Sequence, residues 1–172
     1  LHGDWNFGGS LQGDALIALG VNAMGDFQSI HLSGYHSNDI AIGENALRYM
    51  GQQRNPNPTQ LAGRYNIALG LNAMSGQDLA GNVGDNNVAM GQQALQYNTT
   101  GCNNVALGNG ALQNNTTGNY NVALGYGALF ENTIGSNNVA MGYEALQYNT
   151  TGNNNVALGA NAMNGSALTG CS

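Results

Sequence analysis

Val105-Ala106-Leu107-Gly108 begins a 17-residue unit that the second half of this chain repeats with few changes. The same phrase recurs every 17 residues, as Val88-Ala89-Met90-Gly91, Val122-Ala123-Leu124-Gly125, Val139-Ala140-Met141-Gly142 and Val156-Ala157-Leu158-Gly159. A fixed period of this length marks a structural unit that cannot bury its apolar face alone. Stacked copies bury that face jointly, so the repeat predicts a solenoid in which each unit forms one turn, or rung, of the coil.

The unit, numbered from its Val, reads V-A-(L/M)-G-x-x-A-(L/M)-x-x-N-T-T-G-x-N-N. Positions 1 and 3 are large and apolar and position 2 is Ala, which is the two-residue alternation of a strand. We expect the large residues to face inward and Ala to lie on the opposite face. The predicted core residues are Val88, Val105, Leu107, Val122, Leu124, Val139, Met141 and Val156. Gly at position 4 predicts a corner, and the N-T-T-G run predicts a turn.

The phrase also occurs three times upstream at irregular spacing, beginning at Ile17, Ile40 and Ile67. We expect the same rungs to continue there with longer inserted loops at about 25–39, 48–64 and 75–86. Inserted loops of a solenoid commonly carry its contacts. The predicted fold is an all-β, single-domain parallel β-solenoid, or β-roll, of about eight rungs. The expected organisation is an N-terminal segment at 1–14, irregular rungs at 15–87 and regular 17-residue repeats at 88–172.

An Asn precedes the first strand residue in most rungs. Stacked Asn side chains can hydrogen-bond along a fibre axis as a ladder, and we interpret these residues as structural. They are Asn66, Asn87, Asn104, Asn121, Asn138 and Asn155.

Charge is scarce in this chain: only 7% of its 172 residues are charged, and its net charge is −6. Binding to nucleic acid needs clustered Lys and Arg, so this composition argues against it. No apolar run is long enough for a membrane span. Residues 86–172 contain two charged side chains, Glu131 and Glu144, at different repeat positions. A paired-carboxylate active site is therefore not expected there, and we predict neither an enzyme nor a cofactor.

Two further groups of residues are candidates for metal binding and for oxidation. His31, His36 and Asp39 could ligate zinc, although their spacing matches no established motif and they could equally be ordinary loop residues. Cys102 and Cys171 are separated by four repeats and one residue. Four rungs would place them about 19 Å apart along the axis, too far for a disulfide within one regular solenoid. We predict either a disulfide between subunits or two free thiols.

Asn98, Asn115 and Asn149 each begin an N-x-(S/T) triplet. In a secreted protein these residues could carry glycans, but the triplets also follow directly from the N-T-T turn. The Thr residues at position 12 would form an ice-binding face only if the turn were flat; they are Thr99, Thr116, Thr133 and Thr150. The recurring Tyr residues could bind sugar rings or pack between rungs or subunits; they are Tyr126 and Tyr143 at position 5, and Tyr97 and Tyr148 at position 10.

The (V/I)-A-(L/M)-G-x-x-A-(L/M) phrase with its Asn-rich turns, over about residues 15–163, resembles the head repeats of trimeric autotransporter adhesins. It is also similar to the N-T-T-G-rich repeats of bacteriophage tail-fibre and related surface proteins. The resemblance implies a left-handed parallel β-roll, commonly trimeric, that serves as an extracellular stalk or adhesive head. The repeat of 17 residues is longer than the usual autotransporter head repeat.

We therefore expect a non-enzymatic, extracellular structural or adhesive β-solenoid of a cell surface, a secreted filament or a virion fibre. It would associate with itself, either as a trimer or as an end-to-end polymer. The alternative is a tail-fibre or adhesin head module that binds a receptor or a glycan, and an ice-binding solenoid is a minor alternative.

Overall fold

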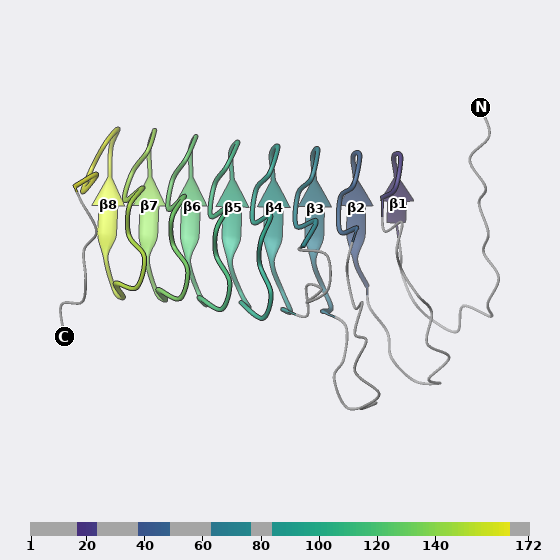
Figure 1. The fold of residues 1–172 in the computed structure, drawn as a ribbon, viewed down its shortest axis with the longest axis horizontal. Coiled ribbons are helices and arrows are strands. Elements are labelled where there is room, and N and C mark those ends of the chain that lie inside the picture. Colours follow the sequence, from purple (N-terminus) through teal and green to yellow (C-terminus); the bar gives the residue numbers. More distant parts are fainter. Residues whose placement is uncertain (1–16, 24–37, 49–62, 77–83, 166–172) are drawn as a thin grey trace.

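The computed structural model describes residues 17–23, 38–48, 63–76 and 84–165. Within them, eight three-residue strands form one sheet in chain order, each parallel to the next (Figure 1). The strands are β1 (Ile17–Leu19), β2 (Ile40–Ile42), β3 (Ile67–Leu69), β4 (Val88–Met90), β5 (Val105–Leu107), β6 (Val122–Leu124), β7 (Val139–Met141) and β8 (Val156–Leu158). Equivalent residues are paired in register at every step, as Val105 with Val122 and Ala106 with Ala123. This is the parallel β-solenoid that the 17-residue period predicted.

The face of each strand that points into the interior is the opposite of the one predicted. Ala at position 2 is buried in β2 through β8, whereas the large residues at positions 1 and 3 are partly or largely exposed. Met90 is 41% exposed and Val156 is 62% exposed, for example. The predicted inward core is therefore wrong for all eight residues: Val88, Val105, Leu107, Val122, Leu124, Val139, Met141 and Val156 lie on the outer face of the sheet.

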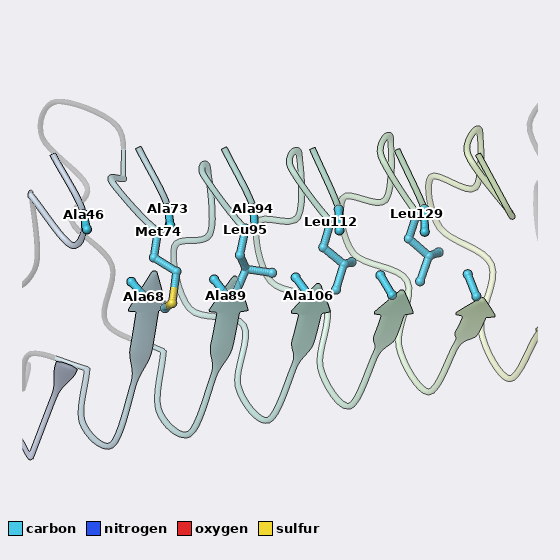
Figure 2. Close-up of a cluster of buried hydrophobic side chains, with 14 of the residues drawn as sticks. Ala46, Ala68, Ala73, Met74, Ala89, Ala94, Leu95, Ala106, Leu112 and Leu129 are labelled. Atoms are coloured by element: carbon cyan, nitrogen blue, oxygen red, sulfur yellow. The ribbon is translucent and has the colours of Figure 1, made fainter. Parts of the chain in front are cut away.

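The small cross-section of the coil explains the reversal. Each complete rung contributes to the core two Ala residues, at positions 2 and 7, and one larger side chain, the Leu or Met at position 8. Figure 2 shows Ala68, Ala89 and Ala106 pointing from the strands toward Met74, Leu95 and Leu112 on the facing wall. A turn of 17 residues encloses room for about one large side chain, because protein interiors are already close-packed. Val and Leu from the strand would overfill it, so they turn outward.

Asn side chains fill the other side of the interior, and the ladder expected from the sequence runs from Asn66 to Asn155. Asn104 donates to the Oδ1 atom of Asn87 from both its backbone N–H, at 2.9 Å, and its Nδ2, at 3.1 Å. The same Nδ2 donates to the carbonyl oxygen of Gly118 at 2.9 Å. Asn suits this place because its amide is both a donor and an acceptor. A buried polar column of this kind is stable only because each polar atom has partners.

A second Asn ladder, which the sequence interpretation missed, runs parallel to the first. It is formed by the Asn at position 11, the first residue of the N-T-T-G turn: Asn98, Asn115, Asn132 and Asn149. Successive Nδ2 and Oδ1 atoms lie 2.8–2.9 Å apart, and Nδ2 also donates to the Gly carbonyl at position 14. That carbonyl also accepts the Nδ2 of the first ladder, so the two ladders are joined at every regular turn.

The corners of each rung depend on backbone that most residues avoid. Gly108, at position 4, has φ = +137°, and a Cβ there would lie 2.5 Å from the carbonyl oxygen of Gly125 in the next rung. Only Gly fits such a place. Left-handed backbone also recurs at positions 6, 8 and 16, as in Glu144, Leu146 and Asn154. Of these left-handed corners only position 4 requires Gly, whereas the stacked rungs hold Leu, Met, Glu and other residues in left-handed backbone at the others.

Candidate interaction surfaces

The outer face of the sheet carries an uninterrupted apolar stripe, two side chains wide. It consists of positions 1 and 3 of the eight strands: Ile17, Leu19, Ile40, Ile42, Ile67, Leu69, Val88, Met90, Val105, Leu107, Val122, Leu124, Val139, Met141, Val156 and Leu158. The parallel register places like residues directly above one another. Seven steps of about 4.8 Å make the stripe roughly 34 Å long, with about 7 Å between its two columns. A soluble monomer rarely exposes so long an apolar surface without a partner.

The predicted loops lie largely outside the described residues, but their roots are described. The described residues end at Arg48 and at Gly76, positions 9 and 10 of their rungs, and begin again at Gly63 and Gly84, both at position 14. In the sequence, the extra residues of these two rungs therefore stand where a regular rung has its N-T-T turn. The strands lie elsewhere in the repeat, and β2, β3 and β4 pair in order, so the apolar stripe is continuous past both rungs.

Asp39, one of the three candidate zinc ligands, lies in the interior of the coil. It is fully buried, it occupies the place of the ladder Asn in the second rung, and its Oδ1 accepts the backbone N–H of Asn66 at 2.6 Å. His31 and His36, its proposed partners, lie outside the described residues. Among the residues that are described, no three His, Cys, Asp or Glu side chains lie close enough to hold a metal ion.

Cys102 is a half-buried free thiol within the described part of the chain, and Cys171 lies outside it. The Sγ of Cys102 accepts the backbone N–H of Asp85 at 3.3 Å, and the backbone N–H of Cys102 donates to the Oδ1 of Asn119 at 2.8 Å. The side chain of Ser136 in turn accepts the backbone N–H of Asn119 at 3.0 Å. The residues at position 15 thus form a third chain of hydrogen bonds from rung to rung, and Cys102 is a weak acceptor in it. The predicted disulfide between subunits stays a prediction.

The candidate glycosylation sites are corrected by the structure. Asn98 and Asn115 are fully buried, and Asn149 is 2% exposed. The Nδ2 that would carry the glycan points into the second ladder, where that of Asn115 donates to Asn98 at 2.8 Å. A glycan on this atom is incompatible with the folded coil, because the interior has no room for it.

The Thr residues at position 12 are half-buried and bond to the turn of the next rung. The hydroxyl of Thr99 donates to the carbonyl oxygen of Thr116 at 2.8 Å, and Thr116 and Thr133 repeat the contact one rung further on. These hydroxyl groups stabilise the stacking of the turns. Ice binding by these residues stays a prediction.

Two Tyr side chains form an exposed pair on neighbouring rungs. The rings of Tyr126 and Tyr143 are stacked, with centroids 5.4 Å apart and planes 9° apart. Glu144 raises the pKa of Tyr143 above its ordinary value, first by accepting a hydrogen bond from the hydroxyl group and then through its negative charge. Tyr97 and Tyr148 share a repeat position, but Asn114 and Glu131 occupy that position between them, so they make no comparable pair.

No protein-family model matches the chain, and neither a curated protein nor a solved structure is significantly similar to it. The described residues include no helix that is long and apolar enough to cross a membrane. The fold itself defines the class: the chain is a parallel β-solenoid repeat protein.

Proposed function

We propose that this chain is a non-catalytic structural protein that associates side by side with copies of itself to form an extracellular fibre or adhesive stalk. The apolar stripe carries the proposal. Sixteen aliphatic or Met side chains face outward in two straight columns, and none of the strand residues is charged. Burying them against a partner would be favourable by about 25 cal/mol per Å² of apolar surface.

A second copy of the same chain is the partner that best fits the stripe. Its side chains recur at the rung spacing of about 4.8 Å along the whole rod. A globular partner could match a few of them, whereas a second solenoid presents the same spacing at every rung. Self-complementary patches of this kind are the usual basis of closed homo-oligomers.

The first Asn ladder favours side-by-side over end-to-end association. Each ladder Asn donates toward the preceding rung and accepts from the following one. The described ladder begins at Asp39, whose carboxylate accepts from Asn66 and has no N–H with which to donate toward the preceding rung. The Asn column therefore stops before β1, and does not run through to the end of the described coil where an axially stacked copy would have to continue it. The side-by-side arrangement agrees with the trimer that the resemblance to autotransporter heads implies.

A non-catalytic role is supported by how the titratable groups of the described residues are arranged. Arg64 and Asp85 form a partly exposed ion pair with 3.4 Å between Nη2 and Oδ2, which is the ordinary behaviour of surface charges. Glu131 accepts a hydrogen bond from Asn114 at 3.2 Å, and Glu144 lies close enough to Tyr143 to raise its pKa. The extracellular location is proposed from the resemblance and from the low charge of the chain.

Sedimentation equilibrium of the wild type and two single-charge variants tests the proposal. Val122→Asp places a carboxylate in the middle of the stripe, and Asn137→Asp adds the same charge at an exposed corner of the same coil. We expect the wild type and Asn137→Asp to be discrete oligomers. Val122→Asp should sediment as a monomer with an unchanged β-sheet circular dichroism spectrum. A monomeric wild type, or an oligomer that Val122→Asp leaves intact, would refute the proposal.

A further inference from the structure

The stacked pair of Tyr126 and Tyr143 ends on an open aromatic face. Each ring covers one face of the other, and both side chains remain about half exposed, at 54% and 51%. Because Tyr126 lies one rung before Tyr143, the uncovered face of Tyr143 is the one on the side of the following rung, which begins with β8. The residue that follows at the same repeat position is Ala160, whose methyl group cannot cover a phenol ring. The backbone of Asn161 donates to the carbonyl oxygen of Tyr143 at 2.8 Å, which holds Ala160 directly beside the open face.

The rung spacing at Ala160 matches the thickness of one stacked ring. Successive rungs are about 4.8 Å apart, and Tyr126 and Tyr143 fill the two preceding steps with rings whose centroids are 5.4 Å apart. A third ring of similar thickness would continue the stack. Ala160 is exposed, so such a ring would have access from solvent.

Polar groups beside this space suit a ligand that carries hydroxyl groups. Glu144 follows Tyr143 in the chain, and its carboxylate can accept several hydrogen bonds. Asn161 is exposed; its Oδ1 accepts the Nδ2 of Asn164 at 3.1 Å, and its own Nδ2 is a donor. Residues 86–172 include no Lys, Arg or His. Nothing in this half of the chain would therefore neutralise a phosphate, sulfate or carboxylate on a ligand.

We propose that Tyr143, Ala160, Glu144 and Asn161 form a binding site for one neutral pyranose ring of a glycan. The C–H groups on a pyranose face carry partial positive charge and stack on the negative face of an aromatic ring. The hydroxyl groups at the rim of the sugar would meet the carboxylate and the amide. The site lies beyond the apolar stripe in the repeat, at positions 5 and 6, so it does not depend on self-association.

Saturation-transfer difference NMR on the wild-type protein, in its native oligomeric state, tests this site. The probes are the neutral oligosaccharides cellotriose, maltotriose and chitotriose, with the acidic sialyllactose for comparison. We expect transfer to the C–H protons of at least one neutral probe and none to sialyllactose. Tyr143→Ala should weaken the binding by about tenfold or more. Tyr148→Ala, an exposed Tyr on the same rung, should leave it unchanged.

Ala160→Gln provides a test that does not remove any side chain from the site. Gln occupies this repeat position at Gln92, and its side chain would fill the proposed space without adding an aromatic face. We expect it to reduce the transfer. The proposal is overturned if no neutral probe binds, if binding survives Tyr143→Ala, or if Ala160→Gln leaves it unchanged.

Discussion

Two Leu→Ala substitutions on one rung test which side of the coil is the interior. Leu129, at position 8, is completely buried among core residues, whereas Leu124, the last residue of β6, faces outward and is partly exposed. Leu129→Ala removes three carbon groups at about 0.8 kcal/mol each and leaves a cavity whose walls are held apart by the neighbouring rungs. The expected cost is about 4 kcal/mol, within the range of about 2.7–5 kcal/mol for buried Leu→Ala changes. Leu124→Ala creates no internal cavity, and its expected cost to a single chain is about 1 kcal/mol.

Urea unfolding followed by circular dichroism measures both variants. The transitions are recorded over a range of protein concentrations, because the part of the stability that comes from self-association depends on concentration. The part that does not vary with concentration belongs to the single coil. If Leu124→Ala proved the costlier of the two at the lowest concentration, the outward assignment of the strand residues would be wrong.

Two other predictions concern the first ladder and the Tyr pair. Asn121→Ala removes the acceptor of the Asn138 backbone N–H and Nδ2 and the donor to Asn104. A buried N–H is then left unsatisfied, so urea unfolding should show that the free energy of unfolding falls by about 3 kcal/mol. The exposed Asn109→Ala is the control and should lower it by less than about 0.5 kcal/mol. Equal losses in the two variants would contradict the ladder. Glu144→Gln removes the negative charge that disfavours the phenolate, so the pKa of Tyr143 should fall toward its ordinary value. Phenolate absorbance during an alkaline titration measures this, and an unchanged titration curve would argue against the contact.

The period of the repeat was sufficient to predict the solenoid and its parallel strands, and the same phrase at Ile17, Ile40 and Ile67 predicted the three further rungs that the described residues contain. Only stacking gives a 17-residue unit enough apolar contact, so the spacing of Val88, Val105 and Val122 decides the fold before any side chain is placed. The first Asn ladder was predictable for the same reason, because in-register stacking brings identical residues together and an amide can pair with its own kind.

The sequence alone did not decide which face of each strand is inside. Alternation separates Ala123 from Val122 and Leu124, but it does not say how much volume the coil encloses, and hydrophobicity favours the larger residues. The signal that could have decided this was how constant each position is. Positions 2 and 7 are Ala in every copy of the phrase, whereas position 1 varies between Val and Ile and position 3 varies among Leu, Met and Ile. A position that tolerates one size only is limited by space.

The tertiary structure alone showed what the turns do. Asn115 and Thr116 have the composition of an exposed turn, and Asn115 also begins a glycosylation triplet. Stacking turns the Asn side chain into the interior and directs the Thr hydroxyl to the next rung. The stacked ring of Tyr143 and the open place above Ala160 likewise depend on which residues occupy adjacent rungs. Contacts between rungs join residues about 17 apart in sequence, so local patterns of turn and strand do not reveal them.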